Sequence, residues 1–548
     1  MNIFRMHILI PVDEETIQSG VLHVKRKLEL ELYNRNLSSE IKVIETGTMG
    51  ISGSGVIMVL YPDQVYYYDV KEKDIPLIVE EHIIKGRIVD SIKHDHGEKS
   101  RACQRIPEGV CFSRTQKRIV LDKCHIVNPY DLEEVIANGG YRALEKILSE
   151  NFKPEHIIEE LKISGLRGRG GAGFPTWIKW NGTKNCESDQ KYIICNADEG
   201  EPGTYKDRLI LEGDPHKLIE AMIIGGYTAG ASKGYIYIRG EYGLSISRIQ
   251  KAIDDAKANG LLGRNILGTD FSFELEIKRG AGAYVCGEET ALIESLEGNR
   301  GNPRVKPPYP VFSGLWSKPT IVNNVETLAN IPDIIYRGGE WFKGFGTDKC
   351  SGTKVFTILG NVEYPGLIEV EMGTTLREII NSYGGGVKGG KRFKAALVGG
   401  AAGVFLSDKL LDVRMDFESL KENAAVLGSG AILVMDEDAS LFDILYSTLE
   451  FFAHESCGQC SPCRIGTHHL MGIMKAIKNG EGTVKDLDDM ISISETMFNT
   501  SLCPLGQSLI MPVKSAIENF REEFRVSETK TTKHRKSETQ RRKQCHLM

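Results

Sequence analysis

Four cysteines near the C-terminal end constrain this chain more than any other feature. Cys457, Cys460 and Cys463 follow one another as C-x-x-C-x-x-C, and Cys503 stands in a later segment, Leu502–Gly506. Three thiolates at this spacing can surround one face of a cubane while a remote cysteine completes it, which is how [4Fe-4S] clusters are commonly held. Zinc also accepts four cysteines, although usually as two separated pairs. The spacing therefore favours an iron–sulfur cluster, with zinc as the alternative.

Composition and charge exclude several classes of protein. The chain has 548 residues and a net charge of −6, which argues against general nucleic-acid binding. Its length allows roughly three or four domains, and no apolar run approaches the ~20 residues that cross a bilayer. Acidic residues at Asp13, Glu14 and Glu15 follow the short apolar run at the N-terminus, so that run does not read as a secretory signal. We expect a cytoplasmic protein whose cysteines are thiols or metal ligands rather than disulfides.

A glycine-rich stretch, Gly168–Lys179, predicts a site for an anion. Glycine lets the backbone approach a ligand closely, so successive N–H groups can converge on a phosphate while Arg167, Arg169 and Lys179 supply positive charge. The letters also fit the dinucleotide fingerprint G-x-G-x-x-G, which needs a strand before it and a helix opening through it. A helical face precedes the glycines and Pro175 follows them, so a standard Rossmann site is disfavoured. A phosphorylated cofactor is the favoured ligand, and a plain turn is the alternative.

Three further polar segments each adjoin a predicted strand or helix end. Asn196–Arg208 follows a β-rich run, so it should lie at a strand end, where α/β proteins bind ligands. Its acidic groups can accept hydrogen bonds from ribose or ribityl hydroxyls, or they form a solvated turn. Gly280–Thr290 carries the pair Glu288 and Glu289, which suits general acid–base work, polar cofactor contacts or a helix cap. Asn323–Thr327 resembles a helix entry whose amides can cap the helix or bind phosphate.

The order of elements predicts a multidomain α/β protein. A small α/β unit comes first, then a charged stretch rich in turns, a domain that alternates helices with β-rich runs, a compact β-grasp-like module, a set of helices and a polar, basic tail that we expect to be disordered. The predicted boundaries are 1–90, 91–130 (linker), 131–349, 350–436, 437–525 and 526–548.

Taken together, these segments resemble the NADH-oxidising flavoprotein subunit of respiratory complex I. They also resemble the homologous β subunit of NAD(P)-linked, often electron-bifurcating, hydrogenases and formate dehydrogenases. The likeness runs from about residue 130 to 525 and includes Ser429-Gly430 as well as the segments above. It implies a degenerate thioredoxin-like N-terminal domain, a Rossmann-like α/β domain that binds FMN and NADH, a β-grasp (ubiquitin-like, SLBB-like) module and a C-terminal four-helix iron–sulfur bundle.

The resemblance also implies a set of site residues. Cys457, Cys460, Cys463 and Cys503 become the ligands of a [4Fe-4S] cluster. Glu201 and Glu289 are the catalytic candidates, in the sense that they position NADH, because no side chain need act as acid or base. The implied cofactor-binding residues are Gly168, Arg169, Gly170, Gly171, Phe174, Lys179, Asn196, Asp198, Glu199, Glu201, Tyr284, Gly287, Glu288, Glu289, Lys306, Asn323, Asn324 and Thr327.

The implied activity is that of a diaphorase subunit. Hydride passes from NADH to flavin N5, and the reduced flavin releases electrons singly to the cluster. The implied partners are iron–sulfur subunits of a larger, possibly electron-bifurcating complex: a thioredoxin-like [2Fe-2S] subunit, or a ferredoxin-like, hydrogenase or formate dehydrogenase subunit. Neither nucleic acid nor a membrane span is expected. An NADP(H)-linked enzyme, a scaffold that keeps the cluster without nucleotide turnover, and a zinc-stabilised binding protein are the alternatives.

The sequence departs from the family pattern in two places. Trp177 stands where the family usually has glycine, and Asn181-Gly182 replaces an aromatic residue that helps to stack the nucleotide, which leaves nucleotide affinity and choice open. In the N-terminal unit, Thr48 and Ser52 occupy the positions of [2Fe-2S] cysteines, so that cluster is expected to be absent. The glycine-rich loop that contains them, Thr46–Gly55, is predicted to be a flexible connection.

Overall fold

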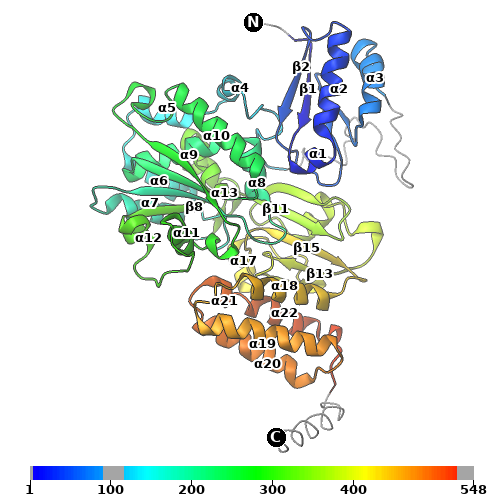
Figure 1. Cartoon of the computed structure of the whole chain (residues 1–548), viewed down its shortest axis with the longest axis vertical. Helices are drawn as coiled ribbons and strands as arrows, with labels where there is room; N and C mark the ends of the chain where they lie inside the picture. The colour runs from blue at the N-terminus through cyan, green and yellow to red at the C-terminus, as the bar shows by residue number, and fades with distance from the viewer. Residues whose placement is uncertain (1–3, 90–115, 528–548) are drawn as a thin grey trace, which may run out of the picture.

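The computed structural model describes residues 4–89 and 116–527 and arranges them as four domains (Figure 1). We name them the N-terminal domain (residues 4–89), the central domain (residues 132–343), the second sheet domain (residues 353–436) and the helical domain (residues 441–527). The basic tail and most of the predicted linker lie outside the described residues. Of the described helices, none combines the length and apolar character that a bilayer span requires.

The N-terminal domain is one sheet with helices packed against it. Its strand order is β2-β1-β3-β4, with β1 parallel to β2 and antiparallel to β3. Its elements are β1 (Met6–Pro11), α1 (Glu14–Gln18), α2 (Val21–Asn34), β2 (Ile41–Thr46), β3 (Met58–Tyr61), β4 (Val65–Tyr67) and α3 (Ile75–Ile78).

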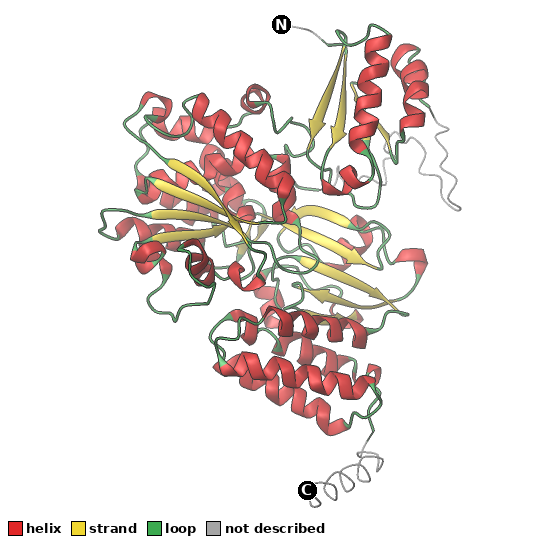
Figure 2. Ribbon diagram, viewed as in Figure 1, coloured by secondary structure: helices red, strands yellow, loops and turns green. Residues whose placement is uncertain are grey.

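The central domain is built on a four-stranded sheet of order β7-β6-β5-β8 in which every neighbouring pair is parallel. Parallel strands end at the same edge, so the segments that follow β5 (Tyr192–Ala197), β7 (Glu274–Gly280) and β8 (Thr320–Asn324) leave the sheet together. These are the three polar segments that the sequence analysis singled out. Helices lie on both sides of the sheet (Figure 2). The remaining elements are α4 (Leu132–Ala137), α5 (Arg142–Ser149), α6 (Pro154–Ser164), α7 (Thr176–Asn185), α8 (Lys206–Gly213), α9 (Pro215–Ala229), β6 (Lys233–Arg239), α10 (Gly243–Ala258), α11 (Glu289–Leu296), α12 (Pro310–Ser313), α13 (Val325–Ala329), α14 (Ile331–Arg337) and α15 (Gly339–Lys343).

The second sheet domain is a mixed five-stranded sheet of order β12-β11-β15-β13-β14. Strand β11 pairs antiparallel with β12 and parallel with β15, while β13 pairs antiparallel with both β14 and β15. Its elements are β11 (Thr353–Gly360), β12 (Gly366–Glu371), α16 (Leu376–Glu378), β13 (Phe393–Val398), β14 (Val404–Ser407), α17 (Phe417–Glu422) and β15 (Ala431–Asp436), and the short strands β9 (Gly346–Thr347) and β10 (Cys350–Ser351) precede it.

The helical domain packs its long helices side by side below the second sheet (Figure 2). Ser440 caps the first of them by accepting a hydrogen bond from Asp443 N, and apolar residues on facing sides form a common core. Its helices are α18 (Leu441–Glu455), α19 (Ser461–Lys478), α20 (Val484–Thr500), α21 (Pro504–Gln507) and α22 (Ile510–Asn519).

The loop predicted as a flexible connection in the N-terminal domain is instead packed against the rest of the protein. The Gly50 carbonyl accepts a hydrogen bond from Leu367 N at 2.7 Å, and Ser52 N donates to Pro365 O at 3.2 Å. A Cβ on Gly47 would lie only 2.4 Å from Gly213 Cα. The glycines therefore allow close backbone approach, and the expectation of a free connection is wrong because it considered the loop without its neighbours.

One buried carboxylate ties the segment before the central domain to the second sheet. Glu369 on β12 accepts hydrogen bonds from the backbone N–H groups of Ile119, Val120 and Leu121 at 2.9, 3.0 and 2.9 Å. The Thr353 hydroxyl donates to the same carboxylate at 2.5 Å. Burial raises the pKa of Glu369, and these donors oppose that rise.

We therefore predict that Glu369→Gln destabilises the protein by about 2 kcal/mol, because an amide NH₂ replaces one acceptor and leaves a buried N–H unpaired. Glu371→Gln, two residues further on at an exposed position, is the matched control and should change stability by less than about 0.5 kcal/mol. Thermal unfolding of both variants checks this, and equal midpoints would contradict it.

Candidate functional site

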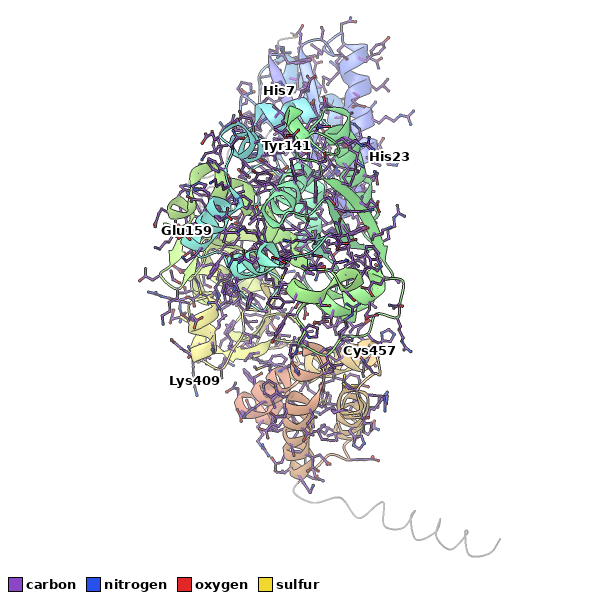
Figure 3. All side chains as sticks on the ribbon, turned by 90° about the vertical axis from the view of Figure 1, so that its left-hand side faces the viewer. His7, His23, Tyr141, Glu159, Lys409 and Cys457 are labelled. Carbon is purple, nitrogen blue, oxygen red and sulfur yellow. The ribbon has the colours of Figure 1, made fainter. Side chains whose placement is uncertain are left out.

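The four cysteines meet in a recess where the helical domain adjoins the central domain, and Figure 3 marks Cys457 at this boundary. Cys460 is the N-cap residue of α19 and Cys503 is that of α21. All four thiols line one recess together with Pro303 and Leu505. Among the described residues, no three Cys, His, Asp or Glu side chains converge closely enough to hold one metal ion. What favours a [4Fe-4S] cluster over zinc is the spacing of three cysteines in C-x-x-C-x-x-C with a remote fourth.

Burial keeps the thiols of the recess in their neutral form while no metal is bound. Burial raises the pKa of Cys503 to about 11 and also raises that of Cys463. Backbone N–H groups at the start of α21 oppose the rise at Cys503. Without a metal these thiols stay protonated at neutral pH, whereas a metal cluster would hold them as thiolates.

The glycine loop forms a closed turn against the start of α13. Gly168 N donates to Phe174 O at 2.8 Å, and the Arg169 N–H donates to the Thr327 hydroxyl at 2.7 Å. Helix α6 precedes the loop and α7 begins only at Thr176, after Pro175. The arrangement thus differs from a Rossmann fingerprint, as the sequence predicted.

The arginines of the loop do not supply free positive charge to it. Arg169 is 1% exposed, and its guanidinium donates to the Thr353 and Ser351 carbonyls at 3.0 and 2.8 Å. Arg167 donates to Gly173 O at 2.6 Å and pairs with Glu418 at 2.7 Å. Both side chains hold the second sheet domain against the loop, which corrects the expectation that they face a phosphate.

Asp198 and Glu199 follow β5 at the sheet edge and differ in their surroundings. Asp198 is 8% exposed, and its Oδ2 is buried with no hydrogen-bond partner among the described residues. Glu199 accepts from the N–H groups of Asp207 and Arg208 at 2.9 and 3.1 Å and so caps α8. Burial raises the pKa of each carboxyl to about 7, and Asp207 adds to the effect at Glu199. Asp198 is therefore the acceptor that remains available to a ligand.

Glu201 joins the central domain to the two domains beside it. Its carboxylate accepts from the Tyr284 hydroxyl at 2.6 Å and from Ala402 N at 3.2 Å. Tyr284 N in turn donates to Glu455, the last residue of α18, at 3.0 Å, and the Tyr284 ring contacts Phe451 at a centroid distance of 5.1 Å. Tyr284 thus connects the sheet edge with the helix that leads into the cysteine motif.

Glu288 and Glu289 have separate tasks. Glu288 caps α11 by accepting from Thr290 N at 2.8 Å, and Lys306 lies 2.8 Å from its other oxygen. Glu289 pairs with Lys179 at 2.7 Å and with Lys306 at 3.3 Å. Although burial acts to raise it, the pKa of Glu289 is held below its usual value by the two lysines. Glu289 therefore stays ionised, which does not suit a proton donor at neutral pH.

The amide side chains also have protein partners. Asn196 Nδ2 donates to Gly287 O at 2.8 Å, and Asn323 Oδ1 accepts from Trp180 Nε1 at 2.8 Å. Asn324 is the N-cap residue of α13. Phe174, at the end of the glycine loop, is 47% exposed. The polar residues of the predicted cofactor-binding set thus lie in or beside the segments at the carboxyl edge of the sheet, whereas Phe174 is an exposed ring of the glycine loop.

The family departures lie in helix packing. Trp177 is on α7, packs against the main core, and has Lys162 Nζ 5.9 Å from its ring centroid. A Cβ on Gly182 would meet Val311 of α12 at 3.8 Å.

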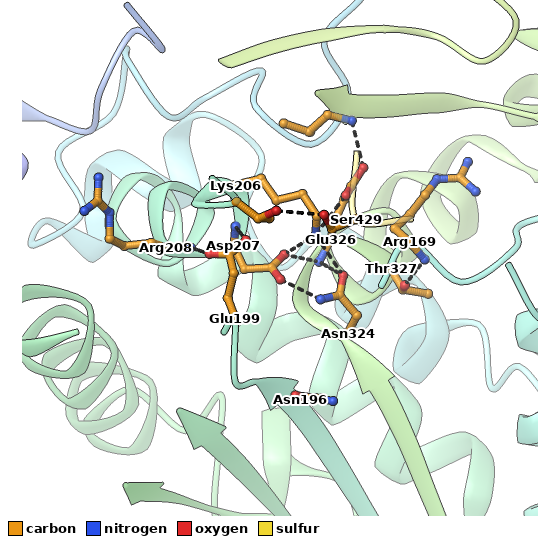
Figure 4. A network of polar contacts seen from close by, with 12 residues as sticks. Arg169, Asn196, Glu199, Lys206, Asp207, Arg208, Asn324, Glu326, Thr327 and Ser429 are labelled. Carbon is orange, nitrogen blue, oxygen red and sulfur yellow. Dashed lines mark hydrogen bonds and ion pairs between the residues drawn. The ribbon is translucent and has the colours of Figure 1, made fainter. Parts of the chain in front are cut away.

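Sequence reasoning missed the roles of Lys206 and Asp207, which lie beside Asn324 (Figure 4). Only their position in the segment after β5 signalled them.

The buried Asp198 generates a pH prediction. The pKa of Asp198 is about 7 in the folded protein, against an ordinary value of 3.8. The folded state therefore binds the proton more tightly than the unfolded state, and the protein loses stability as pH rises from about 4 to about 7. Asp198→Asn removes the titration and should unfold at a progressively higher temperature than the wild type as pH rises from 5 to 8, by the equivalent of about 3 kcal/mol across the range. Thermal unfolding of flavin-free protein measures this; a difference independent of pH would contradict it.

Comparisons with known proteins agree with this site. Residues 161–333 match the Nuo51 FMN-binding domain, 355–405 the SLBB domain and 443–527 the NADH-ubiquinone oxidoreductase-F iron-sulfur binding region. The NADP-reducing hydrogenase subunit HndC of Solidesulfovibrio fructosivorans is 51% identical over 411 residues, 75% of this chain and 83% of that protein. The homologous NADH-quinone oxidoreductase subunit of Escherichia coli is 45% identical over 398 residues, 72% of this chain and 89% of that protein.

A solved NAD+-reducing [NiFe]-hydrogenase matches with a TM-score of 0.68 and 30% identity, over 97% of this chain and 85% of that one. These findings confirm the resemblance. The chain belongs to the family of FMN- and [4Fe-4S]-binding flavin oxidoreductase subunits that includes the NADH-quinone oxidoreductase and HndC proteins named above.

Proposed function

We propose that this chain exchanges electrons between NAD(H) and the iron–sulfur partner subunits of a larger redox complex. The observation that carries the proposal is the position of Tyr284. Its hydroxyl contacts Glu201 at the sheet edge, while its backbone N–H and ring contact α18, which leads directly into the cysteine motif. The contacts of Tyr284 therefore connect the candidate flavin site with the helix that leads to the candidate cluster site.

The residues present fit the two cofactors. The orphaned Asp198 Oδ2 is a buried acceptor that a ligand with hydroxyl groups would satisfy, and burial without such a partner is unfavourable. At Gly170 an added Cβ would lie 3.1 Å from Asn324, so the loop allows close approach that larger residues would block. When bound, FMN exchanges a hydride with NAD(H) and passes on single electrons, and a [4Fe-4S] cluster carries them.

We assign the predicted residues to roles on this basis. Gly170 and Gly171 offer backbone N–H groups to a phosphate, and Gly168 closes the loop by donating to Phe174 O. Asp198 and Asn324 offer polar side chains. Glu199 and Glu288 act through the helices that they cap. The Lys179–Glu289–Lys306 set, with Glu201 and Phe174, positions the nucleotide. The cysteines Cys457, Cys460, Cys463 and Cys503 hold the cluster.

The domain scheme supports the same proposal. The N-terminal sheet, with its parallel and antiparallel pairs, fits a thioredoxin-like domain, and residues 1–90 contain no cysteine to hold a [2Fe-2S] cluster. We propose boundaries at 1–90, 91–130, 131–349, 350–436 and 437–525, with the middle module a β-grasp and the last a four-helix bundle. Electron bifurcation and a cytoplasmic location stay predictions.

An anaerobic titration of the purified protein tests the proposal. We expect NADH to bleach the bound FMN. Metal analysis of the same protein should find about four iron atoms per chain and no stoichiometric zinc. An NADP(H)-linked enzyme is the second candidate, because the similar HndC protein is named as NADP-reducing; bleaching by NADPH alone would favour it. Flavin and iron that neither nucleotide reduces would favour a scaffold, and zinc without flavin would overturn the proposal.

A ligand variant separates the two cofactors. Cys503→Ala should lose most of the iron while it keeps FMN and its bleaching by NADH, because Cys503 lines the recess and the glycine loop lies in another domain. Cys195→Ala, at a buried thiol on β5, is the matched control and should keep its iron. Full iron content in Cys503→Ala would contradict the assigned ligand set.

A further inference from the structure

Figure 4 shows a group of buried charges next to Asn324, one of the residues of the candidate flavin site. Lys206 and Asp207 begin α8, Glu326 belongs to α13 and Lys354 to β11, and none of the four is more than 3% exposed. Lys206 Nζ lies 2.7 Å from Asp207 and 3.0 Å from Glu326, and Lys354 Nζ lies 2.7 Å from Glu326. Two ammonium groups thus balance two carboxylates, and the network crosses from the central domain to the second sheet domain.

This network fixes one side chain of the candidate site, Asn324. Asn324 Nδ2 donates to Asp207 Oδ2 at 2.6 Å. Its Oδ1 accepts from Lys206 Nζ at 3.3 Å and from Glu326 N at 3.0 Å. A flipped amide would place its NH₂ against an ammonium and a backbone N–H, and its oxygen against a carboxylate. Only one orientation of the amide therefore satisfies its neighbours.

The orientation of the Asn324 amide matters because it leaves one N–H of the side chain without a partner in the described part of the chain. One hydrogen on Asn324 Nδ2 is used by Asp207, and the second has no partner among the described residues. The amide lies along the glycine loop, since a Cβ built on Gly170 would be 3.1 Å from Asn324 Cβ and 3.8 Å from Nδ2. A donor of defined direction is thus held beside the loop by Asp207, Lys206 and the Glu326 N–H.

We propose that Lys206 and Asp207 are positioning residues that orient the Asn324 amide so that its spare N–H is presented to FMN. The inference rests on the FMN site of the proposed function. It adds that the buried charges contribute to flavin affinity only through Asn324. The same amide in the flipped orientation would present a carbonyl oxygen instead.

Asp207→Asn tests this without changing a residue assigned to the flavin. In either orientation the new amide places its NH₂ against a donor, Asn324 on one side or Lys206 and Glu326 N on the other. We expect FMN to bind flavin-free Asp207→Asn about tenfold more weakly than wild type, measured by quenching of FMN fluorescence. Glu220→Gln is the matched control, because Glu220 is a buried carboxylate that accepts three backbone N–H groups elsewhere and should keep its affinity.

A double-mutant cycle separates positioning from general destabilisation. If Asp207 acts through Asn324, then Asp207→Asn has no further effect on FMN affinity in an Asn324→Ala background. Losses that multiply in the double variant, or wild-type affinity in Asp207→Asn, would overturn the inference.

An exchange variant keeps the test open should Asp207→Asn fail to fold. Asp207→Asn with Asn324→Asp swaps amide and acid, which retains the net charge and allows every hydrogen bond of the pair to re-form. We expect its unfolding temperature to return to that of the wild type while FMN binding stays as weak as in Asn324→Ala. An exchange variant as unstable as its single parents would overturn the inference. A wild-type protein that binds no FMN would instead refute the proposed function.

Discussion

Parallel pairing of β5 with β6 and β8 is the constraint on which the site depends. A parallel sheet cannot close its turns locally, so each strand ends in a long connection, and all these connections begin at one edge. The ends of β5, β7 and β8 and the segments that follow them carry most of the polar side chains of the site, including Asp198, Glu288 and Asn324. The geometry of the site thus follows from strand direction before any individual side chain contributes.

Burial at that edge then decides what each charged group does. A carboxylate removed from water must find donors, and helix N-termini offer unpaired N–H groups, so Glu199 and Glu288 cap α8 and α11. Lys206 and Lys354 are paired with carboxylates for the same reason, although burial still lowers the pKa of Lys354 to about 8. A buried ion pair adds little net stability. The main effect of these ion pairs is to fix the arrangement of hydrogen-bond donors and acceptors around Asn324.

Sequence patterns predicted the local features of this architecture. The glycine loop, the strand ends and the cysteine spacing are readable because their chemistry lies within a few consecutive residues. The interior partners were not readable. Arg169 donates to Thr353 and Ser351, and Glu369 binds Ile119, Val120 and Leu121, across long sequence separations. Positive charge beside a glycine loop suggested phosphate binding, whereas in the structure the guanidinium groups of Arg167 and Arg169 both bind protein atoms. The prediction for the loop Thr46–Gly55 was wrong for the same reason, since the residues that the loop contacts belong to other domains.

The departures at Trp177 and Asn181-Gly182 are accommodated in the packing of α7. Both lie on α7 beyond the glycine loop, and their neighbours are Lys162 of α6 and Val311 of α12. Changes that alter how α7 packs against α6 and α12 need not reach the Lys179–Glu289–Lys306 set, because Lys179 is held from the other side by Glu289 and the Val322 carbonyl. That pairing keeps one ionised carboxylate between two lysines beside the segment after β7, which is what the proposed nucleotide-positioning role requires. The retained charge arrangement, more than the helix that carries it, is what favours a working electron-entry subunit.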